Sequence, residues 1–206
     1  MKVEFLLSGH LANYANCYGI TTDKAAIVVD PGTYTVGLKQ FLEENADKKR
    51  LILLTHAHYD HIGGAAQLRR ETGVKIAIGK NEEFALSNIA YNLSGRFTAP
   101  IPPFNADYTI DDEDEFAVGD ITVKAYELSG HTVGGMCYLM EDNLFSGDML
   151  FYHTVGRVDL PGGNMSEMKD SLERIMWLFD DDTKVYSGHG EMTTIGHERK
   201  YNPYLR

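Results

Sequence analysis

Apolar residues near the start of the chain fall into short runs rich in β-branched and aromatic side chains, with polar residues or glycine between the runs. The runs lie at residues 3–7, 14–20 and 25–29. This pattern predicts a meander of strands. It stops at Asp30, Pro31 and Gly32, where the proline keeps Asp30 out of helical dihedral angles and the glycine permits a reversal into a helix near 35–45.

Strand and helix signals alternate in the next part of the chain. A short apolar strand at 51–54 precedes a helix predicted over 62–71, which Gly73 ends. A strand at 74–78 and a helix near 81–90 follow, in the order typical of α/β proteins.

The stretch 91–108 contains three prolines and lacks periodicity, so it predicts a surface loop. Its aromatic residues would either line a substrate mouth or anchor the loop to the core: Tyr91, Phe97 and Phe104.

The second half repeats the plan of sheet followed by helix. Strands are predicted at 115–118, 121–128, 136–141 and 143–146. The whole pattern predicts two packed sheets flanked by helices. A length of 206 residues, 43% of them hydrophobic, suits one domain over 1–206 with a substantial core.

Charge and composition exclude some classes of function. The formal net charge is −11, although much of the excess comes from two acidic runs that read as solvated turns, at 111–115 and 180–182. Nucleic acid is an unlikely partner on these grounds, because its phosphates would be repelled. No apolar run is long enough for a signal peptide or a membrane helix, and two cysteines outside any CxxC unit fit a reducing compartment, so a cytoplasmic protein that binds no membrane is expected.

One turn concentrates metal-binding side chains. His56, His58, Asp60 and His61 lie within six residues, between the apolar strand at 51–54 and a helix-like segment. Imidazole nitrogens and carboxylate oxygens are ligands of zinc, iron and manganese, so a metal site is predicted. The alternative is a polar turn with capping histidines, but imidazoles this close repel when protonated and need partners when buried.

Three later turns each present one further metal-binding side chain. His131 lies in a glycine-rich turn, Asp148 follows an apolar strand, and His189 stands between two glycines at the end of another strand. Each signal is weak alone, but together they repeat one pattern, a strand running into a small-residue turn. Asp30 also ends a buried strand, and it either supports the histidine turn from behind or bonds its own backbone.

This ordered set resembles the metallo-β-lactamase superfamily. The motifs are HxHxDH at 56–61, GHT at 130–132, SGD at 146–148 and GHG at 188–190. The resemblance implies mixed α and β structure, of the α+β or α/β class, in a four-layer αββα sandwich with the site at one edge of the two sheets. It implies that a first metal is held by His56, His58 and His131, a second by Asp60, His61 and His189, and that Asp148 bridges both.

Two further stretches resemble the glyoxalase II branch, the hydroxyacylglutathione hydrolases and their short bacterial relatives. They are 147–151 with 156–163, and 187–196 with 202–203. The chain differs from glyoxalase II at Asp159, where that enzyme has a tyrosine, and in the short segment after His189, where that enzyme has a helical domain that helps hold glutathione.

Several residues are candidates for substrate binding. Arg157, nine residues after Asp148, lies where glyoxalase II has a basic residue for the substrate's carboxylate, but it could equally pair with Asp159. Tyr152 and His153 also follow Asp148 closely. Two other histidines are expected in a surface loop and in solvent: His10 and His197.

These features predict a binuclear hydrolase that cleaves a thioester or small acyl ester by metal-activated hydroxide, with Asp60 orienting the hydroxide and shuttling its proton. Two divalent ions are expected, zinc first, with iron or manganese also suitable. The resemblance leaves an alternative, sulfur oxidation by a persulfide dioxygenase with one iron. A third alternative is a metal-binding domain without catalysis, but a closed structural site needs only about four ligands.

Overall fold

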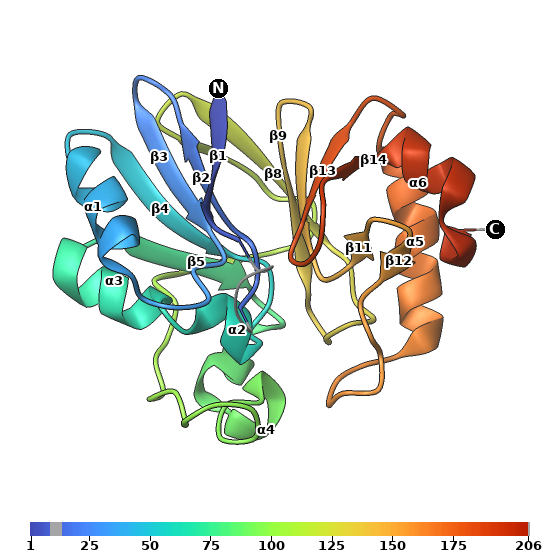
Figure 1. Ribbon diagram of the computed structural model, residues 1–206, viewed down its shortest axis with the longest axis horizontal. Helices are drawn as coiled ribbons and strands as arrows, with labels where there is room; N and C mark the ends of the chain where they lie inside the picture. Colours follow the sequence, from blue (N-terminus) through green and yellow to red (C-terminus); the bar gives the residue numbers. More distant parts are fainter. Residues whose placement is uncertain (9–13, 206) are drawn as a thin grey trace.

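Two six-stranded sheets pack face to face, and helices cover both outer faces, in the computed structural model, which describes residues 1–8 and 14–205 (Figure 1). Apolar clusters fill the space between the sheets and the space under each helical layer. The four-layer αββα sandwich predicted from the sequence is therefore confirmed.

The first sheet has its strands in chain order, from β1 to β6. They are β1 (Lys2–Leu7), β2 (Cys17–Thr21), β3 (Ala25–Val29), β4 (Lys49–Leu54), β5 (Lys75–Gly79) and β6 (Tyr108–Ile110). The strands from β3 to β6 pair in parallel, and every residue of β3 is buried. Burial on both faces explains why β3, β4 and β5 read as largely continuous apolar runs in the sequence.

The second sheet has the order β14-β13-β10-β9-β8-β7. Its strands are β7 (Glu115–Val118), β8 (Ile121–Glu127), β9 (Met136–Met140), β10 (Asn143–Gly147), β13 (Lys184–Ser187) and β14 (Thr193–Thr194). A separate two-stranded hairpin lies beside it, formed by β11 (Leu150–Phe151) and β12 (Thr154–Val155). The four strands predicted between 115 and 146 are confirmed within a residue or two at their ends.

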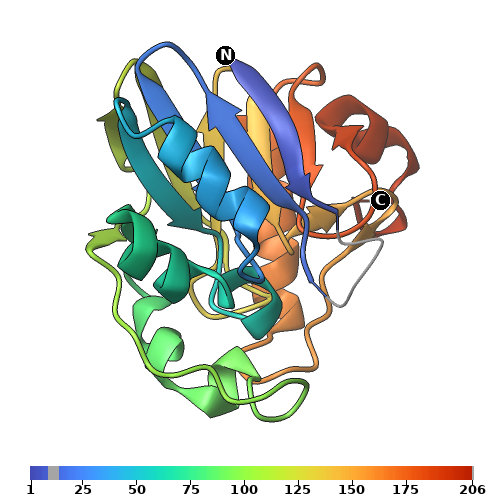
Figure 2. The ribbon, with the colours of Figure 1, turned by 60° about the vertical axis from the view of Figure 1, so that its left-hand side comes forward.

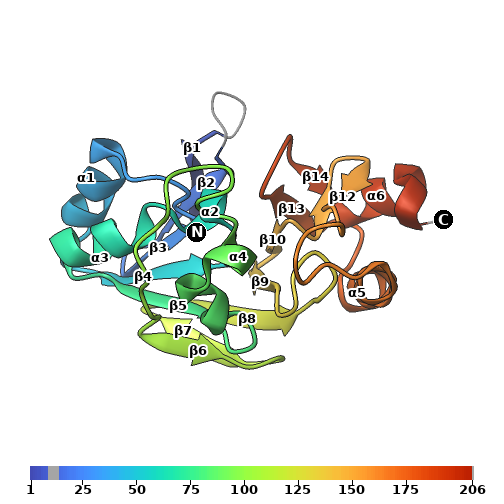
Figure 3. The ribbon, with the colours of Figure 1, turned by 90° about the horizontal axis from the view of Figure 1, so that it is seen from below.

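Helices α1 (Val36–Glu44) and α3 (Ala65–Thr72) cover the first sheet, and α5 (Met165–Leu178) and α6 (Ile195–Tyr201) lie outside the second (Figures 2 and 3). Thr35 caps α1 by accepting from the amide of Leu38, and Asn164 caps α5 in the same manner. In the described parts of the chain, no helix is long and apolar enough to cross a membrane.

The helices predicted at 62–71 and 81–90 differ from the observed ones. The first begins at Ala65, as α3, because Ile62 ends a separate short helix, α2 (Tyr59–Ile62), and two glycines lie between them. A Cβ on Gly63 would meet the carbonyl oxygen of Gly32 at 2.4 Å, so the chain there passes too close for a larger residue. Gly73 ends α3 with φ of 71°, as predicted. The second is replaced by two short elements, a 3₁₀ helix, η2 (Glu83–Ser87), and a single turn of α-helix, α4 (Ile89–Asn92).

Aromatic rings fill the space between the sheets. Phe145 is fully buried and stacks on Tyr186 with ring centroids 5.0 Å apart, and it meets Tyr18 edge to face at 5.6 Å. Cys17 and Cys137 are both buried as free thiols.

Replacement of Phe145 by alanine is expected to lower the free energy of unfolding by about 3–5 kcal/mol, because it leaves a cavity between the sheets. Trp177→Ala is the matched control, since this aromatic residue is 90% exposed and its loss should change stability by about 0.5 kcal/mol or less. Chemical denaturation followed by circular dichroism measures both. Equal effects of the two substitutions would contradict the core described above.

Candidate metal centre

Strands of both sheets end at the same edge of the sandwich, near α2 in Figure 1. Strands β3, β4 and β5 are parallel, so the turns that follow them lie together, and β10 and β13 are parallel in the other sheet. Strand β8 points the same way as β10, because each is antiparallel to β9. All the turns that carry the predicted metal-binding side chains therefore lie at this edge.

Three histidine nitrogens meet in the first half of the site. The Nδ1 atom of His58 lies 3.0 Å from Nε2 of His56 and 2.9 Å from Nε2 of His131. All three residues are at most 5% exposed. A hydrogen bond can join two of these nitrogens through one proton, but the third lone pair then remains without a donor.

The second half combines a carboxylate with two imidazoles. Oδ2 of Asp60 lies 3.2 Å from Nε2 of His189 and 3.9 Å from Nε2 of His61. Asp148 lies between the halves, with Oδ1 3.3 Å from His61 Nε2, and Oδ2 3.5 Å from the Nε2 atoms of both His131 and His189. The structure thus brings all seven predicted ligands together, and they are named the seven-donor centre below: His56, His58, Asp60, His61, His131, Asp148 and His189.

Hydrogen bonds on the far side of the rings aim three Nε2 atoms inward. Asp30 accepts from Nδ1 of His61 at 2.9 Å, and it also accepts from the amide (2.8 Å) and the hydroxyl (2.6 Å) of Thr55. The Thr55 hydroxyl in turn lies 3.1 Å from Nδ1 of His56, and the carbonyl oxygen of Arg157 lies 2.7 Å from Nδ1 of His131. Such partners fix the tautomer and orientation of ligating imidazoles. Asp30 therefore supports the turn from behind.

Burial favours the neutral form of the imidazoles in the first half of the site. It lowers the pKa of His56 well below the ordinary value and that of His58 to about 3, and neighbouring imidazoles add to both effects. Burial would lower the pKa of His61 too, but the three carboxylates around it outweigh burial and raise it well above the ordinary value. A neutral imidazole carries the lone pair that a metal ligand needs.

The donor atoms fit divalent metal ions. Two buried atoms that face each other, His61 Nε2 and Asp148 Oδ1, make no hydrogen bond with any described residue. Among the described residues, Asp30, Asp60 and Asp148 form ion pairs with histidines and with no Lys or Arg. Buried carboxylates without a fixed cation and imidazoles with inward lone pairs are the surroundings that zinc or iron would compensate.

Two glycines on either side of Asp148 in the fold permit close packing of the side chains there. A Cβ on Gly188 would lie 2.3 Å from Oδ1 of Asp148, and one on Gly147, whose φ is 50°, would lie 2.4 Å from the Thr55 hydroxyl. Both positions need glycine for close approach, and the second needs it also for its backbone conformation.

Sequence reasoning missed two residues that hold the turns together. Glu82, 2% exposed, accepts the amide of Ala57 at 3.1 Å and that of Gly134 at 3.0 Å, so it joins the turn of His56 to the turn of His131. Asn16, 1% exposed, donates from Nδ2 to carbonyls on both sides of His189. Neither belongs to a motif, because each contacts backbone groups that only the folded chain brings near.

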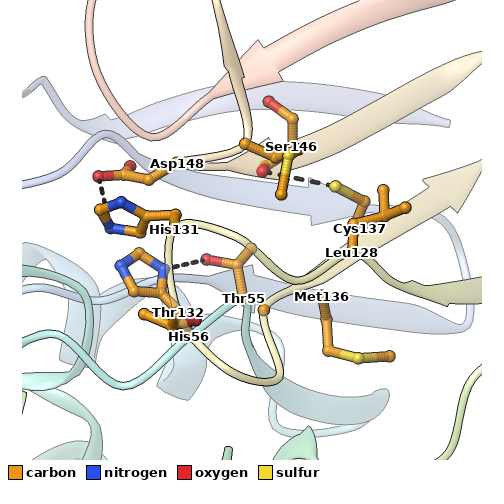
Figure 4. A pocket seen from close by; sticks show the side chains of 11 residues that line it. Thr55, His56, Leu128, His131, Thr132, Met136, Cys137, Ser146 and Asp148 are labelled. Carbon is orange, nitrogen blue, oxygen red and sulfur yellow. Dashed lines mark hydrogen bonds and ion pairs between the residues drawn. The ribbon is translucent and has the colours of Figure 1, made fainter. Parts of the chain in front are cut away.

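A wide pocket opens onto the centre. Its volume is about 420 Å³, and its walls are mostly apolar or aromatic beside the donors. Residues outside the centre that line it include Tyr59, Leu93, Phe97, Phe151, Arg157 and Leu160. On the inner side, among Thr55, His56, His131 and Asp148, only about 10 Å³ remains (Figure 4), so a substrate must enter from the wide side.

The candidate substrate-binding residues lie in different places. Arg157 lines the pocket, but its guanidinium makes a bidentate pair with Asp159 at 2.6 and 2.7 Å. Tyr152 lines a neighbouring hollow, and the His153 ring meets His197. The three aromatic residues of 91–108 have different roles. Phe97 lines the pocket, whereas Phe104 is buried in the core and Tyr91 packs against that core. The remaining histidine, His10, lies outside the described residues.

The profile of the metallo-beta-lactamase superfamily matches residues 11–189. The chain belongs to this superfamily. It is 34% identical to hydroxyacylglutathione hydrolase GloC of Haemophilus influenzae over 195 residues, and this matched region covers 92% of each chain. This relative agrees with the glyoxalase II-like branch indicated by the sequence.

Two solved structures of the superfamily resemble the fold closely. The BLEG-1 B3 metallo-beta-lactamase has a TM-score of 0.88 and 34% identity, covering 99% of both chains. ETHE1 from Myxococcus xanthus has a TM-score of 0.79 and 26% identity, covering 98% of this chain and 84% of the other.

Gly188→Ala should reduce metal content, because the added methyl group displaces the Asp148 carboxylate. We expect metal affinity to fall by about tenfold or more while circular dichroism stays unchanged. Gly37→Ala is the matched control, since a Cβ there meets only the Thr35 hydroxyl at 3.8 Å, and in helix α1 it should stabilise the fold by about 0.5–1 kcal/mol. Competition with a chromophoric chelator measures the affinity, and unchanged binding in Gly188→Ala would refute the spatial constraint.

Proposed function

We propose that this chain is a binuclear metal-dependent hydrolase that cleaves thioesters or small acyl esters. The observation that carries the proposal is Asp148, whose two oxygens face both halves of the seven-donor centre at the floor of an open, largely apolar pocket. A closed structural site would need fewer donors and no access from outside.

Each half of the centre would hold one ion. His56, His58 and His131 would bind the first, Asp60, His61 and His189 the second, and Asp148 would contact both, with zinc as the first expectation and iron or manganese as alternatives. When bound, the two ions would supply a water activated near neutral pH and would polarise the substrate carbonyl.

Asp60 is the residue proposed to handle the proton. Its carboxylate lines the pocket and is 16% exposed, so it can accept a hydrogen bond from the attacking water and pass the proton to the leaving group. A thiolate leaves readily, which reduces the need for a strong acid. The cysteines are poor nucleophiles here, because both are buried and burial raises the pKa of each thiol.

The pocket walls suit an acyl group. Tyr59 and Phe97 stack with centroids 5.9 Å apart, and Phe151 and Leu160 add further apolar surface. Arg157 also lines the wall, and its guanidinium would meet a carboxylate of the substrate only by exchanging its pair with Asp159. Tyr152 and His153 are more distant candidates for contact. The similarity to GloC supports a hydroxyacyl thioester as the first substrate to assay.

Two other activities have support from the solved structures. Similarity to ETHE1 leaves open the second candidate function, oxidation of a persulfide at a single iron. Similarity to BLEG-1 makes β-lactam hydrolysis a further activity to assay.

One experiment separates these candidates. Metal content per chain is measured by plasma mass spectrometry, together with thiol release from lactoylglutathione, oxygen uptake with glutathione persulfide and β-lactam opening. We expect two ions per chain and thiol release that chelation abolishes and zinc restores. One iron per chain with oxygen uptake and no thioester cleavage would overturn the hydrolase proposal.

Asp60→Asn should lower kcat for the thioester by about a hundredfold or more, because the amide cannot accept the proton. The exposed Asp23→Asn is the matched control and should keep wild-type turnover. Metal content and circular dichroism are measured on both variants, so that loss of an ion is distinguished from loss of the proton acceptor. Wild-type turnover in Asp60→Asn would refute the role proposed for this residue.

A further inference from the structure

We propose that His153 and His197 form a second, peripheral binding site for one divalent transition-metal ion, apart from the seven-donor centre. His153 lies at the turn of the β11–β12 hairpin, and His197 lies in the first turn of α6. With Glu198 they form a group of three metal-competent side chains whose donor atoms all lie within 4.8 Å of one another.

The two imidazoles point at each other. Their Nε2 atoms are 2.7 Å apart, while the ring centroids are 4.9 Å apart and the ring planes differ by only 4°. The rings are therefore nearly coplanar and meet head to head, with one proton between two nitrogens. Two imidazole nitrogens on one tetrahedral zinc ion stand about 3.3 Å apart, since each Zn–N bond is about 2.0–2.1 Å. To bind an ion in place of that proton, the nitrogens must separate by about 0.6 Å and the rings must tilt within their common plane, so that both lone pairs converge on an ion beside the line that joins the nitrogens.

The backbone holds His153 in an unusual conformation for this contact. Its φ is 60°, in the left-handed region, and its amide donates to Oε2 of Glu198 at 2.8 Å. Glu198 is fully buried and also accepts from the Thr193 hydroxyl at 2.6 Å and from Nδ2 of Asn202 at 2.9 Å. Residues in sparsely populated conformations persist where the surroundings hold them, and they cluster at functional sites.

Aromatic side chains fix the ring planes. Tyr152 stacks on His153 at 4.0 Å and on His197 at 5.1 Å, and Tyr201 packs against His197 at 4.8 Å. Two nitrogens and a nearby carboxylate form a donor set that suits zinc, nickel or copper. The preformed ring planes reduce the ordering that an incoming ion would require.

An ion here would fasten the hairpin to α6. The same hairpin supplies Phe151, Thr154 and Val155 to the wall of the substrate pocket. The peripheral site would therefore stiffen one wall of the pocket from outside, whatever reaction takes place at the seven-donor centre.

The test counts zinc per chain. Zinc-loaded protein is equilibrated with zinc buffered at several free concentrations in the micromolar range, and bound zinc is measured by plasma mass spectrometry. We expect the wild type to bind one more zinc per chain than His197→Phe, which keeps an aromatic ring but has no nitrogen. His153→Asn should lose the same ion, because it has no imidazole nitrogen. It should keep the fold, because asparagine tolerates the left-handed conformation. In crystals soaked with zinc, an anomalous peak is expected between the two rings.

Tyr201→Phe is the control, since it keeps the aromatic wall and should bind zinc like the wild type. Circular dichroism checks the fold of each variant, and if His197→Phe does not fold, His153→Asn decides the question. Equal zinc binding by the wild type and the folded histidine variants would overturn the proposal, as would an anomalous signal confined to the seven-donor centre.

Discussion

Imidazole nitrogens that carry lone pairs repel one another at hydrogen-bonding distance unless a proton or a metal ion lies between them. The seven-donor centre places Nδ1 of His58 3.0 Å from Nε2 of His56 and 2.9 Å from Nε2 of His131, so contacts elsewhere must hold these nitrogens there. The Thr55 hydroxyl, itself bonded to Asp30, and the carbonyl of Arg157 do this by contacting the opposite ring nitrogens of His56 and His131. Glu82 does it by joining two turns through their amides. The hydrogen bonds at this edge of the sandwich thus hold the imidazoles close together against their mutual repulsion.

The same need explains how the two sheets are joined near the centre. Tyr138 of the second sheet donates to the carbonyl of Leu54 in the first, and Tyr18 of the first donates to that of Ser187 in the second. Each hydroxyl lies at the end of a ring that is buried in the apolar layer. The turns that carry the donors are thus fixed to rigid strands rather than to mobile loops, which favours a preorganised site.

The sequence predicts the strands well, because they depend on local patterns, and its resemblance to the superfamily predicts that the donors come together. Continuous apolar runs mark β3 and β4, and small-residue turns mark His131, Asp148 and His189. The helix predicted near 81–90 fails because Asn88 starts a new turn there by capping the amide of Ala90. Glu82 and the His153–His197 pair could not be predicted, because their contacts join segments far apart in the chain that only the tertiary fold brings together. The chemical roles of the donors remain predictions for the same reason, since spacing indicates ligands but not reactivity.

The division of the donors between two sheets affects how the chain folds. Four of the seven donors follow β4 of the first sheet, and the other three follow β8, β10 and β13 of the second, so each half of the centre is complete only when the two sheets are docked. Long-range contacts of this kind form slowly, because loop closure must precede them. Ions that bind only when the sheets are docked would shift the population toward the native state by mass action. Their release would therefore lower the free energy needed to separate the two sheets.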